Sequence, residues 1–184
     1  MAKNKPHHVG TLSPEMALLG QLYGSSGHGY DLHRKVLTDL GHVWHLSQSQ
    51  AYAILKRLET QGDISAEEIS QEKLPSRQLL HITPEGRKRF LDWLGSPSGN
   101  STRAIRLEFI TRLYFLNQYF PEKIASAVEQ QQAEIEINIR RLEKMHASLP
   151  DDQLYNSMSL NMRLKQLKAV LEWLDECQKL IQQK

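Results

Sequence analysis

A run of polar side chains between residues 47 and 60 suits contact with nucleic acid. If the run is helical, one face carries small or polar residues, with an aromatic and a basic residue at its edges. Glutamine amides can form paired hydrogen bonds with adenine, and hydroxyls bind bases less selectively. The first turn is therefore predicted to contact bases, and the later turns mainly phosphate. The predicted base contacts are Gln48, Ser49 and Gln50, and the predicted phosphate contacts are Tyr52, Lys56 and Arg57.

A second polar group occupies residues 71–77, the expected tip of a hairpin. Lys73 and Arg77, with the hydroxyl of Ser76, are predicted to hold the phosphate backbone beside the helix. Such contacts position a protein on DNA without reading its sequence, and each neutralised phosphate adds about 0.9 to the salt slope of binding. The net charge of +2 does not by itself indicate nucleic acid. The prediction depends on where the charges lie, because a Lys-Arg pair on a helix is usually a solvated face.

Other groups of reactive residues give no comparable signal. His42 and His45 have a metal-ligand spacing, but no cysteine or acid nearby completes a ligand set, so we expect no metal and no cofactor. Residues 24–29 superficially resemble a phosphate loop, but they join two expected helices and lack the Gly-Lys-Ser/Thr ending. No Ser/His/Asp or paired-carboxylate motif stands out, so we expect no catalytic residue and no enzyme. Cys177 is the only cysteine, which excludes an internal disulfide, and it is predicted to be buried and unreactive.

Three helices are expected before the hairpin. The first, at residues 13–23, begins with the capping sequence Ser-Pro-Glu, and the second, at residues 29–40, ends at Gly41 as a left-handed C-cap. In the third, Ser47 and Gln50 match a capping box. Gly62 is expected to end this third helix. The predicted apolar side of the second helix is Tyr30, Val36, Leu37 and Leu40. The predicted apolar side of the third helix is Ala51, Ile54, Leu55 and Leu58.

A hairpin and a fourth helix follow. Strands are expected at residues 64–70 and 78–82, with Pro75 in the loop tip between them. The next helix opens on Thr83-Pro84-Glu85 and continues to Gly95. Three short helices followed by a hairpin predict a winged helix-turn-helix, whose third helix enters the major groove and whose wing lies along the backbone.

The rest of the chain is expected to be helical. We predict a tail at 1–11, a winged-helix domain at 12–95, a linker at 96–102 and a helical dimerisation and effector domain at 103–184. Leucines recur with heptad spacing in the last helix, which suits packing of helix against helix. The predicted dimerisation residues are Leu160, Leu164, Leu167, Leu171, Leu174 and Ile181. The fold class is therefore mainly α, with a β-hairpin wing.

Five stretches of the chain resemble the PadR family of transcriptional regulators. They are Gly29–Leu32, Gly41–Trp44, Ser49–Ile64, Ile82–Gly86 and Leu91–Leu94. The long helical half is similar to the branch that includes regulators of phenolic-acid detoxification and virulence activators. Ala53 departs from the family, which often has proline there, and Leu80 stands where an aromatic residue is common. The resemblance implies a phosphate contact from Tyr52, a dimer swapped between the first and last helices, and a phenolic acid as one possible effector.

We therefore expect an effector-responsive repressor that binds double-stranded promoter DNA as a homodimer. Trp93, Arg106 and Tyr114, near the expected linker, are candidates for an effector pocket. No apolar run approaches the roughly 20 residues of a membrane span, and residues 1–8 lack the apolar stretch of a signal peptide, so we expect a cytoplasmic protein. The alternative is a winged-helix adaptor that binds proteins; the glutamine, serine, tyrosine and basic residues of the third helix favour DNA.

Overall fold

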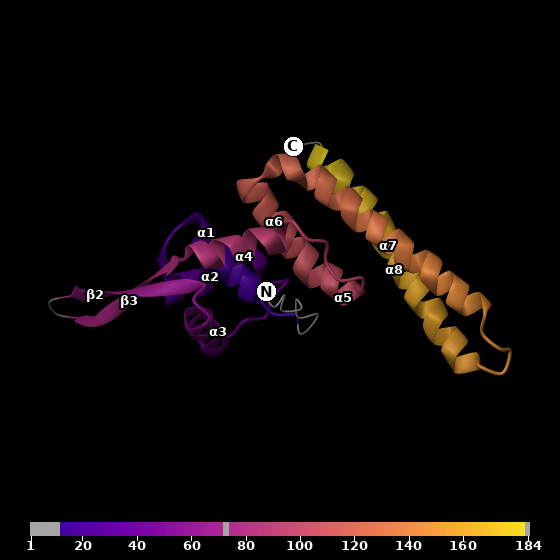
Figure 1. The fold of residues 1–184 in the computed structure, drawn as a ribbon, viewed down its shortest axis with the longest axis horizontal. Coiled ribbons are helices and arrows are strands. Elements are labelled where there is room, and N and C mark those ends of the chain that lie inside the picture. The colour runs from indigo at the N-terminus through magenta and orange to yellow at the C-terminus, as the bar shows by residue number, and fades with distance from the viewer. Residues whose placement is uncertain (1–11, 72–73, 183–184) are drawn as a thin grey trace, which may run out of the picture. The chain divides into compact units, whose positions relative to one another are not determined.

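The computed structural model describes residues 12–71 and 74–182, except for the side chains of residues 70, 71, 74–77, 181 and 182 (Figure 1). The chain divides into two compact units between Gly86 and Arg87. They are called the N-terminal and the C-terminal unit below. The domain limits given above stay predictions.

Apart from one two-residue strand, the N-terminal unit has the predicted order of helices and strands. Its elements are α1 (Glu15–Gly24), β1 (Gly27–His28), α2 (Gly29–Leu40), α3 (Gln48–Thr60), β2 (Ile64–Gln71), β3 (Leu74–Ile82) and the start of α4 (Pro84–Leu94). Strands β2 and β3 form a hairpin that extends from the three helices (Figure 1). This arrangement is a winged helix, and the predicted mainly helical fold class is confirmed.

Helix α3 has the predicted start, end and buried side. The backbone N–H of Gln50 donates to Ser47 Oγ at 3.2 Å, and the Ser47 N–H donates to Gln50 Oε1 at 2.9 Å, which completes the capping box. The predicted stripe from Ala51 to Leu58 is buried. Gly62 follows in the left-handed conformation with φ 81°, which glycine adopts without a steric penalty. Because one side is fixed in the core, the polar side of α3 faces outward.

The sheet differs from the prediction at both ends of β3. Its strand order is β1-β3-β2, and the two-residue strand β1, which the sequence analysis missed, pairs with Leu79 and Leu80. The predicted tip at residues 71–77 is wrong, because β3 begins at Leu74 and includes Pro75. At that end β3 pairs only with β2, so a proline without an N–H is tolerated on the open side.

Helix α2 is oriented differently from the prediction. Val36 and Leu40 are buried as expected, but Tyr30 and Leu37 are exposed. Leu32 and His33 take the inner positions, and His33 Nε2 lies 2.8 Å from the Leu46 carbonyl oxygen. The predicted left-handed cap at Gly41 is also wrong, because its φ is −64°. Glycine is needed at position 41 for a steric reason, because a Cβ would overlap the Leu37 carbonyl oxygen.

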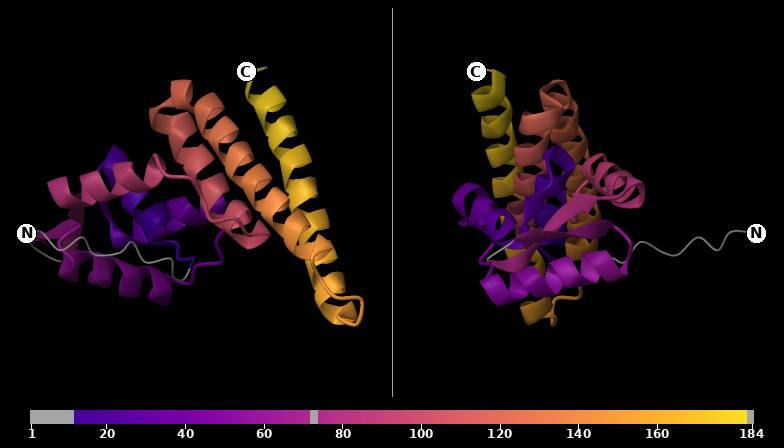
Figure 2. Two further views of the ribbon diagram at one scale, coloured as in Figure 1. Left: turned by 45° about the vertical axis from the view of Figure 1, so that its right-hand side comes forward. Right: turned by 90° about the vertical axis from the view of Figure 1, so that its left-hand side faces the viewer.

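The C-terminal unit is all helical. After α4 it contains α5 (Thr102–Ala104), the π-helical turn η1 (Ile105–Phe109), α6 (Ile110–Tyr119), the 3-10 turn η2 (Pro121–Lys123), α7 (Ile124–Ala147) and α8 (Leu154–Gln182). A π-turn thus separates α5 from α6, and Pro121 starts a 3-10 turn before the long helix α7. Helices α7 and α8 lie side by side (Figures 1 and 2). None of the described helices is long and apolar enough to span a membrane.

The segment after α4 is held by buried polar side chains. The backbone N–H of Ser98 donates to Gln131 Oε1 at 2.8 Å, and Gln131 Nε2 donates to the Ser98 carbonyl at 3.4 Å. Arg112 donates to the Trp93 carbonyl at 2.9 Å and to Ser98 Oγ. Asn138 binds the Asn100 carbonyl at 3.4 Å. We call Trp93, Ser98, Arg112 and Gln131 the clasp; it fixes the stretch that composition suggested was a linker.

Arg112 is a buried cation within the clasp. Only 5% of its surface is exposed, and its guanidinium lies 4.7 Å from the centre of the Trp93 ring. Burial lowers its pKa to about 10, and the charge of Glu108 partly opposes that change. At neutral pH the side chain stays charged. Its desolvation is offset by the two hydrogen bonds and by the aromatic ring.

Candidate nucleic-acid interface

The first turns of α3 place the predicted contact residues on the surface. Gln48, Ser49 and Gln50 are exposed. Tyr52 is 47% exposed, and the Lys56 side chain is 78% exposed. A recognition helix needs this arrangement, with polar groups at its N-terminal end and its apolar side fixed in the core.

The two glutamines at the start of α3 are not equivalent. Gln50 Oε1 already accepts the Ser47 N–H in the capping box. Paired recognition of adenine uses the amide oxygen and the NH2 group together. Gln50 therefore cannot supply both groups while it caps the helix, whereas Gln48 is exposed and outside the capping box.

The two basic residues of α3 also differ. Lys56 Nζ lies 3.0 Å from Glu59 Oε2 one turn later; the Lys56 side chain is exposed and the Glu59 side chain is half-buried. Arg57 Nε lies 3.1 Å from Glu15 Oε1, and the Glu15 side chain is only 14% exposed. Because Glu15 belongs to α1, the Arg57 pair joins two helices. An exposed lysine pair is readily exchanged for a phosphate, while a partly buried pair between helices is held more firmly.

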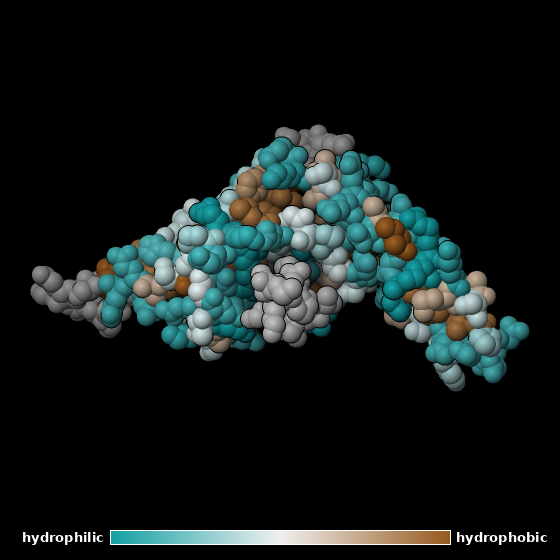
Figure 3. All heavy atoms as spheres, viewed as in Figure 1, coloured by the Kyte–Doolittle hydropathy of each residue, from teal (hydrophilic) through white to brown (hydrophobic). Residues whose placement is uncertain are grey.

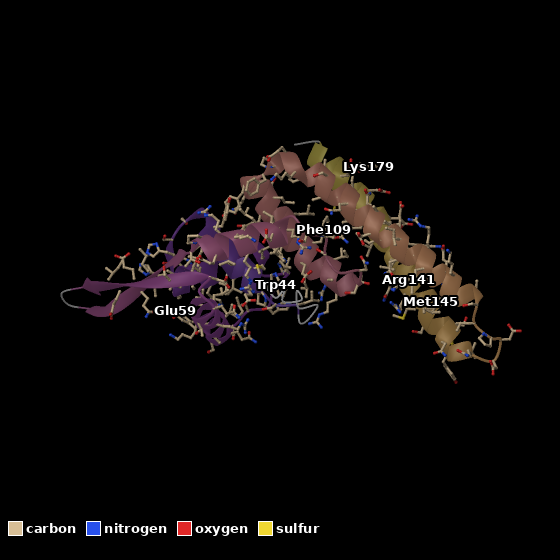
Figure 4. All side chains as sticks on the ribbon, viewed as in Figure 1. Trp44, Glu59, Phe109, Arg141, Met145 and Lys179 are labelled. Carbon is tan, nitrogen blue, oxygen red and sulfur yellow. The ribbon has the colours of Figure 1, made fainter. Side chains whose placement is uncertain are left out.

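A groove of about 720 Å³ lies beside α3 in the N-terminal unit. Its walls come from the start of α2, from α3 and from the base of the hairpin. Glu59, labelled in Figure 4, lies on the α3 wall together with Tyr52 and Lys56. Asp31 and Glu68 add two further carboxylates. The groove therefore presents both charges and two tyrosine rings, since Tyr30 also lines it.

The structure describes the base of the wing more fully than its tip. Lys73 lies outside the described residues, and so do the side chains of Ser76 and Arg77. The backbone of Arg77 pairs with Ile69 in the hairpin. Two bonds of the hairpin base are well defined: Ser26 Oγ and His81 Nδ1 lie 2.6 Å apart, and His81 Nε2 lies 3.2 Å from Glu67 Oε2. They connect the β1 corner to both strands of the wing.

Two of the three residues proposed for an effector pocket share one aromatic cluster. Phe90 packs against Trp93 and edge-on against Phe115, with ring centres 5.9 and 5.2 Å apart. Tyr114 packs edge-on against Phe115 at 4.9 Å. Arg106 is exposed on η1, and the interactions described for this cluster do not include it. The buried cation beside Trp93 is instead Arg112, which sequence reasoning missed because nothing marks a helical arginine as buried.

The heptad leucines of α8 lie within the chain's own helical packing. Leu160, Leu164, Leu167 and Leu174 are buried, Leu171 is half-buried, and the side chain of Ile181 lies outside the description. Helix α7 is the main neighbour of α8, and Lys168 pairs with Glu143 across the two helices at 2.9 Å. These leucines are thus already buried within a single copy of the chain, before any second copy binds.

Other apolar side chains of α7 and α8 are exposed, and the heptad pattern did not find them. They are Ile137, Met145, Leu154, Tyr155, Met158, Met162 and Leu180. Figure 3 shows hydrophobic residues among hydrophilic ones over these helices, and Figure 4 labels Met145 on α7. Such exposed apolar side chains are available for contact with another protein.

Metal and thiol chemistry have little support in the described part of the chain. His42 and His45 are exposed, and no cluster of three or more metal-binding side chains occurs among the described residues. Cys177 is half-buried on α8. Burial, together with the charge of Glu176, raises the pKa of its thiol.

Comparisons with known proteins match both halves of the chain. Residues 18–92 match the profile of the transcriptional regulator PadR-like family, and residues 105–182 match that of the virulence activator alpha C-terminal domain. The negative transcriptional regulator PadR of Bacillus subtilis is 25% identical over 170 residues, covering 86% of this chain and 92% of that protein.

Solved structures of the Bacillus subtilis regulator are also similar. Its complex with operator DNA is 23% identical, with a TM-score of 0.45, and the match covers 91% of this chain and 98% of that one. Its complex with p-coumaric acid is 22% identical, with a TM-score of 0.41, covering 92% and 95%. With its N-terminal half in one profile and its C-terminal half in the other, the chain belongs to the PadR-like family of transcriptional regulators.

Proposed function

We propose that the protein represses transcription by binding operator DNA as a homodimer, with α3 in the major groove. The observation that carries this proposal is the exposed first turn of α3, where Gln48 and Ser49 lie between the two residues of a complete capping box while the opposite side of the helix is buried. Family membership supports the regulatory role. Repression is suggested by the Bacillus subtilis relative, which is named a negative regulator.

Within α3 the residues take different roles. Gln48 reads a base, Ser49 makes a less selective contact, and Gln50 contributes only its NH2 group because its oxygen caps the helix. Tyr52 and Lys56 bind phosphate. Arg57 mainly fixes α3 to α1 through Glu15. Lys73, Ser76 and Arg77 hold the flanking backbone from the wing.

The C-terminal unit supplies the dimer and responds to an effector. The heptad leucines hold α7 against α8, and the exposed side chains around Met145, Tyr155 and Met158 contact the second copy. The effector is a small aromatic acid such as a phenolic acid, bound near Trp93, Tyr114 and Arg106. It acts by changing the spacing of the two α3 helices, which must reach successive major grooves. The protein acts by binding, without catalysis, in the cytoplasm where its DNA lies.

Fluorescence anisotropy tests the DNA proposal. The purified full chain is titrated with the duplex upstream of its own gene and with a scrambled duplex, over a series of salt concentrations. We expect preferential binding to the first duplex and a steep fall of log affinity with log salt. Gln48→Ala should reduce the preference, whereas Gln130→Ala, an exposed glutamine on α7, should not.

Absence of binding to either duplex at low salt, by folded dimer freed of bound effector, would contradict the proposal. It would favour the adaptor alternative. Sedimentation velocity tests the dimer separately: Met158→Lys should yield monomer, while Leu37→Lys, at an exposed leucine of α2, serves to compare the effect of an added charge outside the expected interface.

A further inference from the structure

Gly29 lies directly behind the ring of Tyr52. It is the first residue of α2 and is buried. A Cβ added at Gly29 would lie 3.0 Å from Tyr52 Cε1, 3.3 Å from Tyr52 Cζ and 3.2 Å from Leu55 Cδ1. These separations are shorter than the roughly 3.5–4.0 Å of favourable carbon contacts. The tyrosine ring therefore occupies space that any other residue at position 29 would fill.

The ring has a fixed neighbour on its inner side. Leu55 is buried in the core of the N-terminal unit, so it cannot readily move away. Tyr52 is 47% exposed and is the side chain with freedom to shift. The same ring forms part of the groove wall with Tyr30 and Lys56. A side chain at position 29 would consequently push the phenol toward the groove.

Helix propensity does not account for glycine at this position. Glycine is about 1 kcal/mol less favourable than alanine within a helix. The φ of Gly29 lies outside the left-handed region, because Gly62 is the only residue with positive φ among those described. Neither backbone conformation nor helix formation requires glycine, whereas the close approach of Tyr52 does.

We propose that Gly29 is a positioning residue for Tyr52: the missing side chain seats the phenol ring against the start of α2 and aims its hydroxyl at a DNA phosphate. The proposal rests on the proposed function, in which Tyr52 contacts DNA. A seated ring loses fewer conformations on binding than a mobile one, which favours the complex. Gly29 itself touches no DNA in this arrangement.

A double-mutant cycle tests the proposal by anisotropy with the upstream duplex. The proteins are wild type, Gly29→Ala, Tyr52→Phe and the double variant. We expect Gly29→Ala and Tyr52→Phe each to weaken binding about 10-fold, the order expected for a hydrogen bond to a charged group. In the Tyr52→Phe background, Gly29→Ala should change affinity less than about 2-fold, because no hydroxyl remains to be aimed.

Two further readouts separate positioning from general damage to α3. The phenol is neutral, so Gly29→Ala should leave the slope of log affinity against log salt unchanged, whereas displacement of Lys56 would lower it. In protein labelled with 3-fluorotyrosine, the 19F resonance that is absent from Tyr52→Phe should shift in Gly29→Ala. Gly27→Ala is the matched control, since a Cβ there would meet Leu32 and not Tyr52.

The outcomes separate the two levels of the proposal. Equal weakening by Gly29→Ala in both backgrounds, or no weakening in the wild-type background, overturns the positioning role while leaving DNA binding intact. If Tyr52→Phe binds the duplex as tightly as the wild-type protein, both the phosphate contact of Tyr52 and the positioning role of Gly29 are contradicted. Failure of the wild-type protein to bind the duplex contradicts the proposed function itself.

Discussion

The outward side of α3 and the clasp use similar polar side chains in opposite ways. On α3, Gln48 and Lys56 are exposed to solvent. In the clasp, Gln131 is 0% exposed and Arg112 is 5% exposed, and both bind backbone groups of the same chain. A buried polar group is costly unless it is bonded, so its partners lie within the fold. The difference shows which glutamines and basic residues build the protein and which remain able to bind another molecule.

The largest effect is expected from Arg112→Met. The Trp93 carbonyl and the Ser98 hydroxyl would both lose a buried donor, so the free energy of unfolding should fall by about 2–4 kcal/mol. Urea unfolding followed by circular dichroism measures this. Arg106→Met removes an exposed arginine from the same unit and should change stability by less than about 0.5 kcal/mol. Equal stability of the two variants would break the distinction between clasp and surface.

Arg112 should add no pH dependence near neutrality. Burial lowers its folded pKa to about 10, below that of an arginine in the unfolded chain, so folding disfavours its protonated form. The unfavourable contribution is fully present below pH 10 and is relieved as the pH rises above 10 toward the pKa of the unfolded chain. Between pH 6 and 8, the stability difference between wild type and Arg112→Met should therefore stay constant.

Gln131→Leu should have the next largest effect. Leucine keeps much of the side-chain volume but leaves the Ser98 N–H and carbonyl without their partner, which should cost about 1–3 kcal/mol. The same unfolding experiment applies, with Gln130→Leu on the exposed side of α7 as control. A stability decrease in the control as large as in Gln131→Leu would mean that the helix, and not the clasp, responds to the change.

Changes to the exposed ion pair should alter binding and not stability. Lys56→Met should lower the salt slope by about 0.9, because one phosphate would no longer be neutralised. Glu59→Gln should increase affinity by up to about 5-fold, because it releases Lys56 and removes a carboxylate from the groove. Both variants should unfold within about 0.5 kcal/mol of wild type. Weaker binding by Glu59→Gln would show that this acid supports the interface.

The smallest effect concerns the Cys177 thiol. Because burial raises its pKa, less thiolate is present at pH 8 than in an unfolded chain. Alkylation by iodoacetamide should be several-fold slower in native protein than in urea, and should accelerate as the pH rises. A native rate equal to the rate in urea would place Cys177 with the accessible side chains of the surface.

Periodic patterns predicted the winged-helix unit well, because local sequence decides them. The buried stripe of α3, its capping box and Gly62 depend on residues within a few turns of each other. The two-residue strand β1 is too short to give a pattern, and it forms only because β3 offers an open edge. Gly41 fits either a left-handed cap or a close approach, so its type could not distinguish them.

Hydrogen bonds between residues far apart in the chain could not be predicted from the sequence. Ser98 and Gln131 are 33 positions apart, and Gln131 is the middle one of three consecutive glutamines in α7, of which Gln130 is exposed. Composition made residues 96–102 look like a free connection, but one buried amide satisfies both backbone groups of Ser98. The double use of Gln50, as cap and as predicted base contact, likewise emerged only from the geometry.

The clasp has a consequence for exchanging modules between related regulators. Because Trp93, Ser98 and Asn100 are each bound to α6 or α7, residues 87–100 form one piece with the helices that follow them. A chimera joined at the Pro97–Gly99 stretch would bring in foreign backbone against Gln131 and Arg112. A graft that replaces the winged helix should instead join at Gly86–Arg87, which keeps Trp93, Ser98 and their bonding partners in the same chain.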